Sequence, residues 1–225
     1  MNRETFSLIE NHMLLCMEDS AHDKEHVYRV LYNALEIAKS ESNVNYDVLI
    51  GACLLHDIGR SEQFKNPALC HAMVGSEKAY SFLTEHGFEV SYAEHVKQCI
   101  QTHRFRKNNQ PQSIEAKILF DADKLDVAGA IGIARTLMYK GIVSEPLYTM
   151  LPDGNVSNGE NDVEPSFFKE YKYKLENLYS NFYTAKGEEL AKQRKNVAVT
   201  FYENLFKEVS EPYKKGRSNL SEILL

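Results

Sequence analysis

The segment IGACLLHDIGR, residues 50–60, lies in the most hydrophobic part of this chain and indicates how the chain folds. Together with YDVL before it, the segment is apolar on nearly every side, which is typical of a buried, central helix. Asn45 can cap the start of this helix, and Gly59 offers a place for it to stop. His56 and Asp57 therefore end the most hydrophobic helix expected in the chain. Two polar side chains at such a position call for a chemical explanation.

The segments on both sides of this stretch also have helical periodicity. Apolar residues recur at helical spacing through 26–41, and MNRETFSLIENHMLL at the N-terminus is typical of an amphipathic helix. Further helices are expected at 71–86, 91–103, 113–139 and in two or three segments between 166 and 211, with a surface loop at 150–164 that is either a lid or a connector. Strand-like alternation is nearly absent, so the predicted fold class is all-α. We expect one domain over 1–225, with a catalytic core at about 20–140 and a C-terminal helical extension at about 165–212.

The composition of the chain argues against nucleic acid and membranes as binding partners. Lys and Arg number 26 against 32 Asp and Glu, which gives a net charge of −6 and argues against binding polymeric nucleic acid. No apolar run approaches the length of about 18 residues that suggests a transmembrane helix, and the N-terminus lacks the features of a signal peptide. The four cysteines have no CxxC spacing and indicate neither a disulfide framework nor a four-cysteine zinc site. We therefore expect a cytoplasmic protein without a membrane partner.

Histidines and aspartates lie at inward positions of three separate expected helices. His26 lies near the start of one helix, His56 and Asp57 end the next, and Asp123 lies in the otherwise apolar segment LFDADKLDVAGAIGIA. A buried carboxylate needs a partner or a metal, because burying an unpaired charge is costly. These side chains could converge on one divalent cation or could be ordinary core groups. Spacing alone leaves both readings open, and the core or surface reading is preferred for His12, His86 and His95.

The order His26, His56-Asp57, Asp123 resembles the H…HD…D signature of the HD-domain superfamily of metal-dependent phosphohydrolases. The flanks HDKEHVYRV, ACLLHDIGR, THRFR, SIEAKILFDADKLDVAGAIGIAR and TAKGEELAKQRKN extend this resemblance to small, free-standing bacterial HD hydrolases over most of the chain. The resemblance implies an HD-domain helical bundle and one divalent metal. It assigns the ligands to His26, His56, Asp57 and Asp123. Asp121 and Asp126 are then groups behind the ligands or on the helix surface.

Two departures from the family pattern keep alternatives open. Arg60 stands three residues after Asp57, where the nucleotidase branch of the superfamily tends to have Glu. His71 and His103 fall in the interval where two-metal branches have extra ligands, so they could bind a second metal, contact a phosphate or simply lie nearby. A second metal would favour a di-iron oxygenase or a cyclic-dinucleotide phosphodiesterase. A nucleotide-binding module without turnover is the remaining alternative.

The expected activity is metal-dependent hydrolysis of a phosphomonoester or phosphoanhydride, with a nucleotide or another small phosphorylated metabolite as substrate. Two His and two Asp ligands suit Mn, Fe, Ni, Co, Zn or Mg. We expect Asp57, Asp123 and Lys124 to be catalytic. The expected substrate contacts are cations and imidazoles: His22, Arg29, Arg60, His71, His103, Arg104 and Lys124. The sequence leaves homo-oligomerisation open.

Overall fold

A computed structural model of the protein describes residues 1–17, 24–104 and 109–224. Within these ranges the chain forms helices, turns and one isolated β-bridge between Met150 and Val156, which confirms the all-α prediction. No helix in the described part is long and apolar enough to cross a membrane. The chain divides into two compact units, Met1–Asp126 with Phe182–Glu188 and Val127–Asn181 with Glu189–Leu225. The single domain with a core at about 20–140 stays a prediction.

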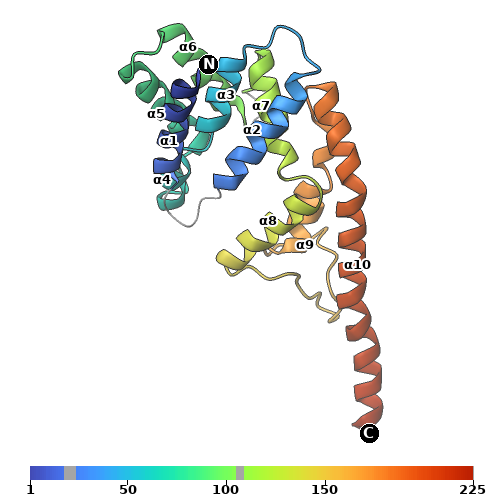
Figure 1. The fold of residues 1–225 in the computed structure, drawn as a ribbon. Coiled ribbons are helices and arrows are strands. Elements are labelled where there is room, and N and C mark those ends of the chain that lie inside the picture. Colours follow the sequence, from blue (N-terminus) through green and yellow to red (C-terminus); the bar gives the residue numbers. More distant parts are fainter. Residues whose placement is uncertain (18–23, 105–108, 225) are drawn as a thin grey trace. The chain divides into compact units, whose positions relative to one another are not determined.

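The first unit is built around one central helix. Its helices are α1 (Arg3–Cys16), α2 (Lys24–Ala38), α3 (Tyr46–Leu55), α4 (Arg60–Lys65), α5 (His71–Glu85), α6 (Val90–Thr102) and α7 (Ile114–Leu125) (Figure 1). Helix α3 contacts α1, α2, α5, α6 and α7, while α5 also packs on α6 and α2 on α7. The segment 52–55 within α3 is fully buried. The prediction that the most apolar stretch forms a central helix is therefore confirmed.

The two ends of α3 are set by different local interactions. At the start, the side chain of Asn45 accepts hydrogen bonds from the backbone N–H groups of Asp47 and Val48. At the other end the helix stops at Leu55, and a turn carries His56 and Asp57 to Gly59, which precedes α4. Gly59 was expected to stop the helix, but the structure gives it a packing role.

Gly59 allows the start of α5 to approach this turn closely. A Cβ atom at this position would lie 2.4 Å from the carbonyl oxygen of His71 and 2.5 Å from the backbone nitrogen of Gly75. Real Cβ atoms essentially never come so close to backbone atoms, so a larger residue would push α5 away from the turn. The glycine thus brings His71 near the His56-Asp57 pair.

The second unit contains α8 (Gly129–Ile142), α9 (Phe167–Glu170), a π-helical turn (Tyr171–Leu175), a 3₁₀ turn (Leu178–Ser180) and most of α10 (Ala185–Ile223). The single helix predicted at 113–139 is wrong, because the chain turns between α7 and α8. Gly129 adopts a left-handed φ of 68°, and a Cβ on Gly132 would lie 2.1 Å from the carbonyl oxygen of Val127. Helix α10 also continues beyond residue 212, where the C-terminal extension was expected to end.

Candidate metal centre

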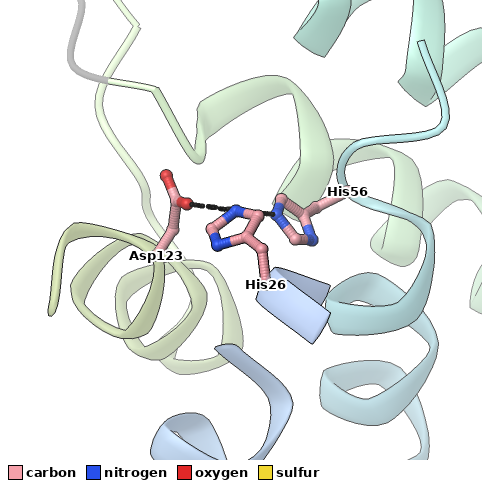
Figure 2. A group of neighbouring side chains, drawn as sticks. All are labelled: His26, His56 and Asp123. Atoms are coloured by element: carbon pink, nitrogen blue, oxygen red, sulfur yellow. Dashed lines mark hydrogen bonds and ion pairs between the residues drawn. The ribbon is translucent and has the colours of Figure 1, made fainter. Parts of the chain in front are cut away.

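Three elements of the first unit bring their polar side chains to one point. Helix α2 supplies His26, the turn after α3 supplies His56 and Asp57, and α7 supplies Asp123. His26, His56 and Asp57 are buried, whereas the side chain of Asp123 keeps 23% of its surface exposed. Figure 2 shows the rings of His26 and His56 and one carboxylate oxygen of Asp123 turned toward one another. Of the four side chains, that of Asp123 is therefore the one with most surface open to solvent.

The distances among these four groups fall in a narrow range. His26 Nε2 lies 3.2 Å from Asp123 Oδ1, 3.4 Å from His56 Nε2 and 3.5 Å from Asp57 Oδ2. His56 Nε2 lies 3.6 Å from Asp57 Oδ2 and 4.0 Å from Asp123 Oδ1. Two ligand atoms that each lie about 2.1 Å from one cation are about 3 to 4 Å apart, so these spacings fit a single coordinated cation.

The orientation of the two imidazole rings supports the same interpretation. His56 Nδ1 lies 2.7 Å from the carbonyl oxygen of Cys53, which can only accept a hydrogen bond. His26 Nδ1 lies 2.7 Å from Asp126 Oδ2. With Nδ1–H donated in both rings, Nε2 of each neutral imidazole carries a lone pair that points toward the other ring. Two lone pairs facing each other at 3.4 Å are unfavourable without a positive charge between them.

A second group of ligand-type atoms shares Asp57 with the first. His71 Nε2 lies 3.3 Å from His103 Nε2 and 3.4 Å from Asp57 Oδ1, and His103 Nε2 lies 3.8 Å from the same oxygen. Both histidines are buried. Asp57 Oδ1 is buried too and accepts no hydrogen bond of regular geometry from the described residues, although Arg60 Nε lies 2.9 Å away. An oxygen with spare lone pairs in such a place fits a cation-binding role.

Burial and charge separate the pKa values of these groups in the metal-free protein. Burial lowers the pKa of His26, but hydrogen bonds to Asp123, Asp126 and Asp57 outweigh it and raise the pKa to about 10. Burial lowers the pKa of His71 to about 2 and that of His103 to about 4. The proton of the first group thus resides on His26, where it balances the carboxylates. Cation binding requires that proton to leave.

The two carboxylates of the site stay ionised for related reasons. Burial raises the pKa of Asp57, but Arg60 and His56 outweigh burial and hold the pKa well below its usual range. Burial likewise raises the pKa of Asp123, and its hydrogen bond with His26 and the charges of the surrounding imidazoles bring it below its usual range. Two carboxylates that remain charged, together with imidazoles that become neutral when the His26 proton leaves, form a donor set suited to a divalent cation.

The structure places the other predicted site residues in different surroundings. Arg29 donates from Nε and Nη2 to the buried Asp126 carboxylate, at 2.8 and 3.0 Å. Arg60 pairs with Asp57, and Arg104 Nη1 lies 3.8 Å from Cys70 Sγ. His22 lies outside the described residues. Each of these remains a prediction as a substrate contact.

Lys124 follows Asp123 in α7 and lies beside two aromatic rings. Its Nζ atom is 5.5 Å from the centre of the Phe120 ring and 4.8 Å from that of Phe182. Burial lowers the pKa of Lys124 to about 8, although the charge of Asp121 opposes the shift. An ammonium group that is partly desolvated in this way interacts strongly with an anion that reaches it.

Several groups support the candidate ligands in ways that the sequence does not define. The sequence leaves Asp126 either behind the ligands or on the helix surface, and the structure places it behind His26. Asp121 is fully buried and accepts hydrogen bonds from Tyr183 N, Thr184 N and Thr184 Oγ1, so it anchors the start of α10. Gln63, which contacts His71 Nδ1 at 2.6 Å, was missed altogether. The DADKLD spacing hinted at Asp126, but no pattern in the sequence pointed to Gln63.

Comparison with known proteins identifies relatives of this chain. A sequence model described as the HD domain matches residues 24–128. The chain is 31% identical over 200 residues to the uncharacterized protein YpgQ of Bacillus subtilis (strain 168). This alignment covers 87% of this chain and 88% of YpgQ. A crystal structure of YpgQ in complex with ADP matches with a TM-score of 0.69 and 26% identity, over 91% of this chain and 97% of that one. An HD-superfamily hydrolase from Bacillus thuringiensis matches with a TM-score of 0.68 and 28% identity, over 92% of this chain and 97% of that one.

Proposed function

The chain belongs to the HD-domain family, and from this premise we propose that it is a metal-dependent phosphohydrolase acting on a nucleotide or another small phosphorylated metabolite. The observation that carries the proposal is the convergence of His26, His56, Asp57 and Asp123, with spacings of 3.2 to 4.0 Å. We assign these four residues as the metal ligands. The structure of an HD-superfamily hydrolase from Bacillus thuringiensis supports hydrolysis, and the ADP bound to YpgQ supports a nucleotide substrate.

The chemistry of the site follows from the positions of its side chains. A divalent cation held by the four ligands would supply Lewis acidity, which lowers the pKa of water and offsets charge on a phosphoryl group. Asp123 turns one oxygen toward His26 and the other away (Figure 2), so the second oxygen is available to accept a proton from an attacking water molecule. Asp57 remains ionised and turns one carboxylate oxygen toward each of the two histidine pairs.

Positive groups around the ligands provide binding sites for the phosphate. Lys124 directly follows Asp123, and its partly desolvated ammonium can contact a phosphoryl oxygen. Arg60 lies beside Asp57, and its side chain keeps 39% of its surface exposed. We assign both to substrate binding, and Arg104 to the outer part of the same site. We expect Arg29 to act mainly through Asp126, which it holds in place.

A panel of phosphorylated metabolites, including nucleoside mono-, di- and triphosphates, tests this function in the presence of Mn²⁺, Fe²⁺, Ni²⁺ or Mg²⁺. We expect metal-dependent release of phosphate or pyrophosphate from at least one nucleotide. The matched control is Asp57→Ala, which should lose both the bound metal and the activity while keeping its helical content. Tight nucleotide binding without product after long incubation would instead identify a binding module, and would refute the proposed hydrolase.

The group formed by Asp57, His71 and His103 favours a second candidate. Its three atoms are 3.3 to 3.8 Å apart, so a second cation would share Asp57 with the first. Two bound metals would favour activity as a cyclic-dinucleotide phosphodiesterase or a di-iron oxygenase. Elemental analysis of the wild type and of His103→Ala separates the candidates. A loss of one metal from an initial two supports the second candidate, and one metal per chain in both proteins supports the first.

A further inference from the structure

The side chain of Gln63 in α4 lies between the backbone carbonyl of Leu69 and the ring of His71. Gln63 Nε2 lies 2.9 Å from the carbonyl oxygen of Leu69, which can only accept a hydrogen bond. The amide nitrogen must therefore face Leu69, and this leaves Gln63 Oε1 facing His71 Nδ1 at 2.6 Å. Because Oε1 can only accept, Nδ1 carries the hydrogen. The lone pair of the neutral His71 ring is then on Nε2.

The other imidazoles of the site are held differently. His56 and His103 donate to backbone carbonyls three residues earlier, those of Cys53 and Ile100, so the helical backbone itself fixes their tautomers. His26 is held by the buried carboxylate of Asp126. Among the described histidines of the site, only His71 is held by a neutral side chain from another helix, and that side chain is partly exposed. A single substitution on the surface can thus change the state of a buried ring.

The backbone around His71 is fixed independently of Gln63. The close approach of Gly59 to the carbonyl oxygen of His71 and to Gly75 sets the position of the start of α5. This packing holds the main chain but does not choose between the two ring nitrogens of His71. The remaining choice, the tautomer and the tilt of the ring, depends on the hydrogen bond at Nδ1.

We propose that Gln63 is a positioning residue of the site, which holds His71 as an acceptor whose Nε2 lone pair faces Asp57 Oδ1 and His103. The proposal rests on the proposed function in that His71 belongs to the same site. It also changes the role of His71. A neutral ring with its lone pair on Nε2 cannot donate a hydrogen bond to a phosphate oxygen, so His71 acts on a cation or a proton and not as a direct phosphate contact.

The experiment compares Gln63→Met with Gln63→Glu. Met has a similar length but no acceptor for Nδ1–H. Glu loses the donor to the Leu69 carbonyl but keeps an acceptor for Nδ1–H, so it serves as the conservative rescue. The matched control is Gln98→Met, because Gln98 is an exposed glutamine that bonds only Glu94 among the contacts described for its side chain. The first readout is the ¹⁵N NMR spectrum of histidine-labelled, metal-free protein, in which His71→Gln identifies the signals of His71. The second is Mn²⁺ affinity by calorimetry.

The wild type, Gln63→Glu and Gln98→Met should all show a protonated Nδ1 and an unprotonated Nε2 at His71. Gln63→Met should show a mixture of tautomers and an Mn²⁺ affinity or kcat/KM lower by about tenfold or more. A wild-type tautomer together with wild-type affinity in Gln63→Met would overturn the proposal. If the tautomer follows Gln63 while every variant, including the wild type, lacks phosphohydrolase activity, the positioning role stands and the proposed function fails. Circular dichroism of each variant excludes misfolding, and Gln63→Ser replaces Gln63→Met if the latter does not fold.

Discussion

Removing the carboxylate of Asp126 should weaken metal binding although this residue is not among the proposed ligands. Asp126 is fully buried, lies 2.7 Å from His26 Nδ1 and accepts two hydrogen bonds from Arg29. In Asp126→Ala the His26 ring loses the partner that fixes its tautomer and tilt. Outer partners of this kind typically contribute 10- to 100-fold to metal affinity, so we expect the Kd for Mn²⁺ to rise by about that factor.

The same substitution should also lower stability, by an amount that the surroundings of Arg29 limit. Breaking a buried ion pair costs about 3 to 5 kcal/mol when the remaining charge stays buried. The Arg29 side chain keeps 33% of its surface exposed, so its charge can regain some hydration, and we expect the lower end of that range, about 3 kcal/mol. For a chain of this size, that loss corresponds to a fall in Tm of about 6 to 12 °C.

Calorimetric titration with Mn²⁺ measures the affinity, at a temperature well below the unfolding transitions of the wild type and the variant. A thermal melt measures the stability. The matched control is Arg29→Met, which breaks the ion pair but leaves Asp126 beside His26. We expect Arg29→Met to lose stability while its Mn²⁺ affinity stays within about threefold of the wild type. Wild-type affinity in Asp126→Ala, or equal losses of affinity in the two variants, would show that Asp126 does not support the metal through His26.

Three further predictions concern residues of α7 and the buried Tyr171. Asp121→Ala should lose about 2 to 4 kcal/mol of stability but keep its metal, because it removes the acceptor of the Tyr183 N–H and of the buried Thr184 N–H and hydroxyl. Asp123→Ala should lose the metal but keep its stability, and elemental analysis with a thermal melt would expose a wrong assignment if the two results were exchanged. Lys124→Met should lower kcat/KM about ten- to a hundredfold, in line with loss of one charge-assisted hydrogen bond, and unchanged kinetics would remove Lys124 from the site. Burial raises the pKa of Tyr171 to about 12, so the unfolded chain loses this proton first, near pH 10, and the free energy of unfolding should fall as the pH rises above that value. In thermal melts between pH 8 and 11.5, Tyr171→Phe should show a smaller fall in Tm than the wild type. Identical pH profiles of the two proteins would contradict this prediction.

The helices that could be predicted are those whose pattern of apolar residues is compatible with only one structure. The stretch around 50–55 is apolar on all sides, so only a central position buries it, and the structure places α3 there. The predicted helix at 113–139 failed because periodicity continues across the turn at Gly129. A glycine can lie within a helix or adopt a left-handed φ, and only tertiary packing decides between the two.

The all-helical fold and the residue types of the candidate site could be predicted from the sequence, because helical periodicity and the order of His and Asp residues are local properties of the chain. The tertiary structure decided which of these residues meet. His26 and Asp126 are a hundred positions apart, and Asp57 faces two pairs of histidines through its two oxygens. Gln63 gave no signal in the sequence, since its role depends on a carbonyl oxygen and a ring nitrogen that only folding brings within hydrogen-bond distance. A hydrogen bond is a relation of a few ångströms between atoms, and spacing along a chain does not encode it.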